Sequence, residues 1–240
     1  INEEIDRLRH SATRSLFERN DVIVVASVSC IYGLGEPENY FKAAIHINKS
    51  EPLDRDTLLK ELVAIHYTRN DLSLDRGTFR VIGDIVEIRS PYDNFTVKIE
   101  FFGDEIERIT TNELITNIIL LEKDSISIYP AVHYLTSDDD IEICCKEIEK
   151  ELAQRVQELQ AENKLVEAQR ILQRTNYDLE MIKEVGYCNG IENYSRIFDK
   201  RPAGSPPSTL LDYFPDDFLL VIDESHVTLP QIRGMYNGDL

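Results

Sequence analysis

Two adjacent acids near the C-terminal end of the chain are the residues best placed to do chemistry. Asp223 and Glu224 directly follow an unbroken apolar run, residues 218–222, which predicts a strand buried on both faces of a parallel sheet. In an open α/β sheet, ligands bind beyond the carboxyl ends of such strands. Asp223 would hold Mg²⁺ through water, and Glu224 would position and deprotonate a water that attacks a phosphate. Ser225 and His226 follow the pair and favour a nucleotide site over the alternative, a capped strand end before a polar loop.

The other half of a nucleotide site is missing from the sequence. A glycine-rich loop ending in Lys-Ser or Lys-Thr would hold the phosphates, yet the chain contains no Gly-Lys dipeptide. Glu36 follows the one close glycine pair, Gly33 and Gly35, and a carboxylate there would repel phosphate. The chain begins at Ile1 without Met and ends at Leu240, soon after the predicted catalytic strand. We therefore expect a segment of a longer protein, with part of the active site outside it.

Composition narrows the classes of protein that the chain can belong to. Its 240 residues, 42% of them hydrophobic, have room for one large or a few small globular domains. No apolar run reaches the ~18 residues of a membrane span, and no signal peptide is visible, so a cytoplasmic protein is expected. The four cysteines have neither disulfide nor zinc spacing. With a net charge of -18, any DNA contact must come from particular basic residues.

Segments near the N-terminus are expected to support the acid pair. Residues 2–19 carry apolar side chains at spacings of three and four, which predicts an amphipathic helix. Its basic outer surface is either simply solvated or contacts phosphate. Residues 21–27 predict a second buried parallel strand, and the hydroxyls of Ser27 and Ser29 at its end either contact phosphate or cap a turn. Residues 37–47 predict another helix.

The middle of the chain has the pattern of a small antiparallel sheet. A short helix is expected at residues 57–65. Alternating apolar residues flank Gly-Asp pairs at 83–84 and 103–104, which predicts two hairpins with two-residue turns. Strands at 118–121 and 125–128 would complete the sheet. Alternation places Arg80, Lys98 and Glu100 on one exposed face, which is either an ordinary solvated surface or a protein-binding face.

The next segment is predicted to be a helical hairpin. Residues 138–185 are expected to be helical, and apolar residues from Ile141 to Leu159 keep a nearly regular heptad rhythm. A polar stretch at 161–164 is expected to divide this segment into two helices packed side by side. Gly186 is the natural end of the second helix, and residues 200–208 are too rich in Pro and Gly for regular structure.

Several long motifs resemble one family. They are GIENYSR at 190–196, TLLDYFPDDF at 209–218 and DESHVTLPQIRGMYNGD at 223–239, with shorter ones at 8–13, 25–35, 76–80 and 100–108. Together they resemble the UvrB family, the helicase-like, damage-verifying subunit of bacterial nucleotide excision repair. The resemblance runs through the whole chain in one order.

The resemblance implies a multidomain fold of the α/β and α+β classes. Residues 1–40 and 206–240 would belong to a partial RecA-like helicase motor domain. Residues 41–134 would form an inserted, small antiparallel β-rich domain that docks UvrA, and residues 135–205 a helical insert that supports the DNA-gripping hairpin. The phosphate-binding loop, the hairpin, the second motor domain and the UvrC-binding tail would lie outside this chain.

The resemblance also implies roles for individual residues, which are carried over position by position. Asp223 and Glu224 match the Mg²⁺ and water-activating pair, and His226 would couple ATP hydrolysis to the rest of the protein. The DNA-contacting positions are Arg9, Ser27, Ser29, Arg174, Tyr187 and Glu192, and the UvrA-docking positions are Arg69, Arg80, Lys98 and Glu100.

The chain departs from the family at three of these positions or beside them. Lys98 and Ile82 stand where relatives can carry Arg, and Tyr187 stands where they often carry Phe. Since Arg binds a carboxylate with two parallel donors and Lys does not, we expect a docking face that is weaker or differently arranged.

The implied function is ATP-dependent recognition and verification of DNA damage, with UvrA, UvrC and damaged double-stranded DNA as partners, ATP and Mg²⁺ as cofactors, and no membrane. The segment alone would be inactive as an ATPase. One alternative is a non-catalytic UvrA-binding module. Another is a transcription–repair coupling factor, which shares the docking domain, but the motifs at 190–196 and 223–239 favour UvrB.

Overall fold

The computed structural model describes residues 3–32, 34–134, 138–186, 188 and 190–239. The chain divides into two compact units, which are described one at a time. The first comprises residues 1–31, 37–135 and 210–220, and the second comprises residues 32–36, 136–209 and 221–240. Among the described residues, no helix combines the length and the apolar character that a membrane span requires.

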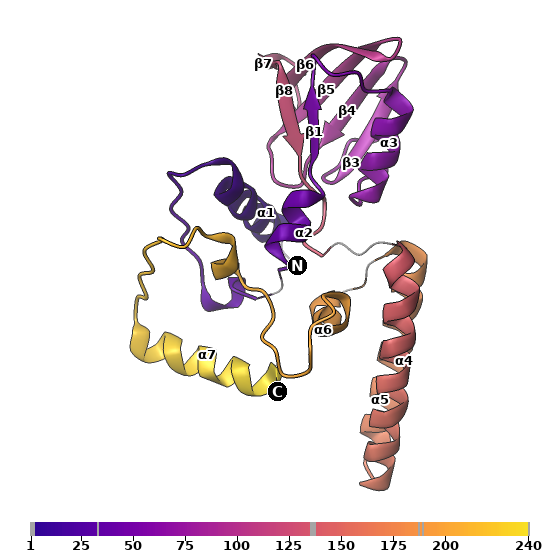
Figure 1. Ribbon diagram of the computed structural model, residues 1–240, viewed down its shortest axis with the longest axis vertical. Helices are drawn as coiled ribbons and strands as arrows, with labels where there is room; N and C mark the ends of the chain where they lie inside the picture. The colour runs from indigo at the N-terminus through magenta and orange to yellow at the C-terminus, as the bar shows by residue number, and fades with distance from the viewer. Residues whose placement is uncertain (1–2, 33, 135–137, 187, 189, 240) are drawn as a thin grey trace. The chain divides into compact units, whose positions relative to one another are not determined.

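The first unit is built around a six-stranded sheet with the order β2-β3-β4-β5-β6-β7 (Figure 1). Only the β2–β3 pair is parallel, and all other neighbours are antiparallel. The strands are β2 (Thr68–Arg69), β3 (Thr78–Ile82), β4 (Ile85–Arg89), β5 (Phe95–Phe102), β6 (Glu105–Glu113) and β7 (Ile119–Lys123). Gly83 and Gly103, with φ of 61° and 63°, open the turns of two hairpins. Both predicted hairpins are confirmed, because glycine alone adopts this backbone region without strain.

One face of the sheet is covered by the helix α3 (Arg55–Ala64). Asp54 caps the helix by accepting a hydrogen bond from the Thr57 amide at 3.0 Å. Leu58 and Leu62 are fully buried in one core with Val86, Ile88, Val97 and Ile99 of the sheet. The opposite face of the sheet is polar, as the alternation of residues predicts.

A separate two-stranded ribbon corrects two predictions. Strand β1 (Ile45–Asn48) pairs with β8 (Ser125–Ile128), so β8 does not join the main sheet. The preceding helix α2 (Pro37–Lys42) is shorter than the predicted helix at 37–47. Burial along β1 alternates, with Ile45 and Ile47 inside and His46 exposed. That period of two is typical of a strand. The strand forms because β8, about 80 residues further along the chain, pairs with it, and a local sequence pattern cannot reveal so distant a partner.

The helix α1 (Glu3–Glu18) is held to the first unit by aromatic rings, and its predicted range is confirmed within a residue or two. Phe17 lies 5.5 Å from Tyr213 of the 3-10 helix η3 (Leu210–Tyr213) and 6.2 Å from Tyr40, measured between ring centroids. Tyr40 in turn lies 5.9 Å from Tyr129. Stacked and tilted rings at these separations attract one another, so segments distant in sequence share one packing centre.

The two predicted buried parallel strands, at residues 21–27 and 218–222, are wrong. Neither run forms a strand, and Ile23, Val25 and Leu219 are 92%, 95% and 88% exposed. An apolar run becomes a strand only where neighbours take up its backbone hydrogen bonds. Within the described residues, no strand lies beside either run.

The second unit contains the predicted helical hairpin, α4 (Asp138–Ala161) and α5 (Leu165–Val185) (Figure 1). Its buried seam includes Cys145, Ile148 and Leu152 from α4 and Leu179 and Ile182 from α5. Gly186 ends α5 in the left-handed region, with φ of 73°, as predicted. The shorter elements are the 3-10 helices η1 (Val28–Cys30), in the first unit, and η2 (Ile191–Tyr194), with the helices α6 (Ser195–Phe198) and α7 (Ser225–Asp239), in the second.

The helix α7 was not predicted from the sequence. The sequence predicts only a segment that follows a catalytic strand. Pro230 argues against a helix there because it lacks an amide donor. Pro230 is the sixth residue of α7, so the helix lacks the hydrogen bond that an amide at this position would donate to the His226 carbonyl.

Candidate functional site

The polar face of the six-stranded sheet brings three charged residues into one row. Arg80 on β3, Glu87 on β4 and Lys98 on β5 are cross-strand neighbours. The Arg80 Nε atom donates to Glu87 Oε2, and Lys98 Nζ lies 2.8 Å from Glu87 Oε1. The carboxylate is 4% exposed and bridges two predicted docking residues. The sheet therefore presents the two cations side by side at a fixed spacing.

The protonation state of Glu87 follows from this row. Burial would raise the pKa of the Glu87 carboxyl, but hydrogen bonds from Lys98 and Arg80 outweigh burial and hold that pKa below its usual value. Glu87 thus stays ionised and keeps both cations in place. Sequence reasoning missed this residue, although it stands opposite Arg80 across a two-residue turn, so register alone could have found it.

The next row of the same face carries Glu100. It lies between Ile85 on β4 and Arg108 on β6 in the strand register. Arg108 donates to Glu122 Oε2 from Nε and Nη2, at 3.0 and 2.8 Å. The structure therefore places Glu100 on the same face as Arg80 and Lys98, as predicted, one row further along.

Arg69 lies apart from that face, on the edge strand β2. Its guanidinium donates to Asp71, with Nη2 2.9 Å from Oδ2. The Asp71 carboxylate also accepts the Val81 amide at 3.1 Å, which ties Arg69 to β3. The predicted docking residues thus occupy one sheet but two of its surfaces, the polar face and the edge.

The acid pair lies in the turn that begins α7, and both side chains are exposed. Asp223 Oδ1 accepts the Glu224 amide at 2.9 Å, and Glu224 adopts a positive φ of 46°. His226 Nδ1 lies 3.3 Å from Glu224 Oε2, so the structure brings these two predicted residues together. The acid pair is therefore positioned by the turn that leads into α7, and not by the end of a strand.

The acid pair can supply only some of the ligands that a magnesium ion needs. Among the described residues, no group of three or more His, Cys, Asp or Glu side chains is arranged to hold a metal. Mg²⁺ in nucleotide sites commonly uses one or two carboxylates together with water and the phosphates themselves. The exposed Asp223 carboxylate suits that limited role.

The residues predicted to contact DNA in the first unit fall into two environments. Arg9 is half-buried on α1, so only part of its side chain reaches solvent. Ser27 and Ser29 are exposed at η1, and their hydroxyl oxygens lie 2.8 Å apart. Both hydroxyls stand at the beginning of a helical turn rather than at the end of a strand.

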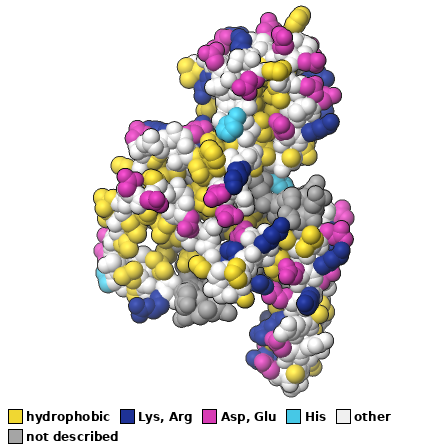
Figure 2. Space-filling view, in the orientation of Figure 1, with side chains coloured by type: hydrophobic (Ala, Val, Ile, Leu, Met, Phe, Trp, Pro, Cys, Tyr) yellow, Lys and Arg dark blue, Asp and Glu magenta, His cyan; other side chains and the backbone are white. Residues whose placement is uncertain are grey.

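In the second unit, Arg174 lies on the exposed side of α5. Its Nε is 3.8 Å from Oδ2 of Asp178, which also accepts the Tyr194 hydroxyl at 2.7 Å. Tyr187 lies outside the described residues, and so does the side chain of Glu192. Basic and acidic side chains are interspersed on the helical hairpin (Figure 2), which agrees with the strongly acidic composition.

A pair of stacked histidines is a further feature that sequence reasoning missed. The rings of His10 on α1 and His133 lie 3.8 Å apart and are nearly parallel. Burial, reinforced by Arg9 and opposed by Asp6, lowers the pKa of His10 to about 4. Burial also lowers the pKa of His133 well below its ordinary value. No periodic signal connects residues so far apart, so only the fold reveals the pair.

Comparison with known proteins places these features in a family. The family described as "UvrB interaction domain" matches residues 45–134, and that described as "UvrB third helical domain" matches residues 139–200. Proteins called "UvrABC system protein B" are similar along 100% of this chain. The identity is 59% for that of Gloeobacter violaceus, 58% for Bacillus licheniformis and 57% for Geobacillus kaustophilus.

The β-rich domain and the helical hairpin therefore define the class: a protein with a UvrB-type interaction domain followed by a UvrB-type helical domain. The chain belongs to the UvrB family, as its motifs predicted. It spans 35% of the Gloeobacter protein and 36% of the Geobacillus protein, about a third of their length.

Proposed function

We propose that this chain is the part of a UvrB-type repair protein that docks UvrA, through the polar face of its six-stranded sheet. The observation that carries the proposal is the row Arg80, Glu87 and Lys98, with Glu100 beside it. Buried Glu87 pairs with both cations, and each cation keeps part of its side chain in solvent, 30% for Arg80 and 15% for Lys98. Such a surface offers paired cations to carboxylates and one carboxylate to a base on the partner.

Binding of the purified chain to UvrA tests this proposal. We expect Arg80→Ala and Glu100→Ala each to weaken the complex about tenfold or more, because each leaves a charge of the partner unpaired in the interface. Lys146→Ala on α4 is the matched control, since Lys146 is an exposed cation paired with Glu142 of the same helix. Affinity that survives both sheet variants would contradict the proposed face.

In the whole protein, we propose ATP-dependent recognition and verification of DNA damage in nucleotide excision repair, receiving DNA from UvrA and preparing it for incision by UvrC in the cytoplasm. The UvrB third helical domain at residues 139–200 favours this function over a transcription–repair coupling factor.

For the nucleotide site, the proposed roles are Mg²⁺ binding through water by Asp223 and positioning of the attacking water by Glu224. Mg²⁺ would neutralise charge on the phosphates of ATP. His226 lies against Glu224 and would sense the state of that carboxylate. The exposed turn keeps these side chains open to groups from elsewhere in the protein.

For DNA, the proposed contacts are Arg9, Ser27, Ser29, Arg174, Tyr187 and Glu192. Arg174 is the best supported by geometry, because it is largely exposed and Asp178 orients it. A single arginine that contacts phosphate changes affinity similarly for all sequences and lowers the salt dependence of binding.

A further inference from the structure

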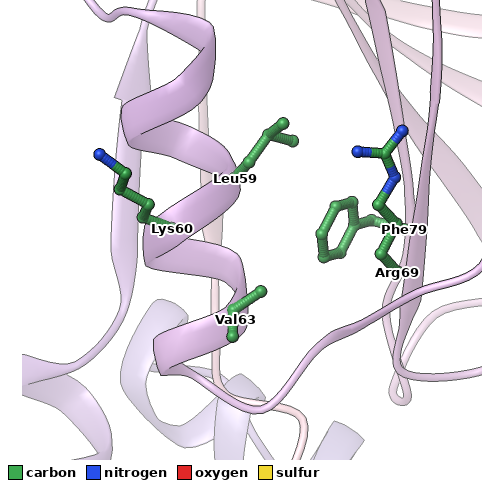
Figure 3. A pocket seen from close by; sticks show the side chains of 5 residues that line it. All are labelled: Leu59, Lys60, Val63, Arg69 and Phe79. Carbon is green, nitrogen blue, oxygen red and sulfur yellow. The ribbon is translucent and has the colours of Figure 1, made fainter.

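A groove lies at the edge of the six-stranded sheet, between α3 and the strands β2 and β3 (Figure 3). It has a volume of about 380 Å³ and is lined by Leu59, Lys60, Val63, Arg69 and Phe79. Leu59 and Val63 point from α3 towards the Phe79 ring, which reaches back from β3 (Figure 3). The walls are apolar, and Arg69 stands at one rim.

The groove exists because α3 carries more apolar surface than the sheet covers. Leu58 and Leu62 are fully buried beneath the helix. Leu59 and Val63 form the next stripe, four residues apart, and Val63 is 58% exposed. This stripe lines the groove together with Arg69 of the short edge strand β2 and stays accessible to an apolar group from another molecule.

The charges at the rim define what kind of group would enter. Asp71 takes the Nε and Nη2 donors of Arg69, and Arg69 Nη1 makes no hydrogen bond within the described part of the chain. Lys60 also lines the groove, but its side chain points away from Phe79 and Arg69 (Figure 3). A guanidinium fixed along one edge offers its free edge to a carboxylate. The rim therefore selects an acidic partner segment.

We propose that this groove receives an apolar side chain that neighbours a carboxylate on the docking partner. Leu59 and Val63 would then extend the UvrA-docking surface from Arg69, at the edge of the sheet, onto α3. This inference rests on the docking function proposed above. Arg69 connects the groove to that function, because it lines the groove and is itself a predicted docking residue, whereas the neighbouring residues Phe79 and Arg80 of β3 point to opposite faces of the sheet.

The experiment compares the affinity of the chain for UvrA in four variants. Val63→Ser removes the apolar contact and Lys60→Gln removes a positive charge from α3, and neither side chain belongs to the buried core. Ile115→Ser is the matched control, since Ile115 is 91% exposed in the loop between β6 and β7. Arg80→Ala reports on the sheet face. We expect Val63→Ser to weaken binding about tenfold and Lys60→Gln about threefold, with Ile115→Ser unchanged.

The outcomes separate this inference from the docking function itself. If Arg80→Ala weakens binding but Val63→Ser and Lys60→Gln do not, the groove is no part of the interface and the inference fails alone. If no variant changes the affinity, or UvrA does not bind, both the inference and the docking function fail. Unfolding temperatures equal to that of the original chain establish that a loss of affinity is not a loss of folding.

Discussion

At the residue scale, Glu87 explains how the predicted docking residues become a site. Arg80 and Lys98 lie on strands that are not neighbours, and like charges there would repel. The buried carboxylate between them replaces repulsion with two ion pairs. Composition and alternation placed the cations on one face, but only the register of three strands shows that one acid joins them.

The stacked histidines predict a dependence of stability on pH. The lowered pKa of His10 and His133 means that the unfolded chain takes up protons first as the pH falls below the ordinary value of about 6.5. Stability is therefore complete above that value and is lost as the pH falls towards the folded pKa, about 4 for His10. Between pH 7 and pH 5.5 we expect a loss of about 1 kcal/mol per histidine.

Urea unfolding at these two pH values measures the effect. Asp6, 3.9 Å from the His10 ring, opposes the loss, and Arg9 adds to it. His10→Leu should reduce the pH dependence, whereas His46→Gln should not, because His46 is exposed beside Ser127. An unchanged slope in the His10 variant would show that the buried pair does not titrate as described.

At the element scale, the sequence predicts those helices and turns that depend on residues close together in the chain. Glycines at the hairpin turns and the heptad rhythm of the helical hairpin each act over a few residues, and these elements are found. The predicted strands at 21–27 and 218–222 depend on neighbours that the described residues do not supply, and their apolar side chains stay exposed. Likewise, β1 depends on β8, which is distant in sequence.

The seam between α4 and α5 carries a prediction of its own. Ile182 is completely buried in this seam, so Ile182→Ala should destabilise the hairpin by about 3 kcal/mol through lost apolar contact and the cavity left behind. Leu172→Ala is the comparison, since Leu172 is 40% exposed on the same helix and should cost less than half as much. Circular dichroism during urea unfolding measures the stability of both variants. Equal losses of stability would mean that Ile182 does not lie in the buried seam.

At the scale of the whole molecule, the acid pair without a Gly-Lys phosphate loop predicts no turnover by this chain alone. ATP hydrolysis should not exceed the background rate. In a full-length protein, Asp223→Ala should abolish hydrolysis, whereas Asp217→Ala, an exposed acid outside the pair, should retain it. Robust hydrolysis by the isolated chain would show that the chain holds a complete nucleotide site without a Gly-Lys phosphate loop.

The central claim is that the sheet, rather than the helical hairpin, docks UvrA. Amide hydrogen exchange of the chain with and without UvrA tests it most directly, because exchange reports which segments become covered. We expect slower exchange at the hairpin turns 83–84 and 103–104 and at the edge strand β2, with α4 and α5 unchanged. Slowing confined to α4 and α5, or no slowing at all under saturating UvrA, would contradict the claim.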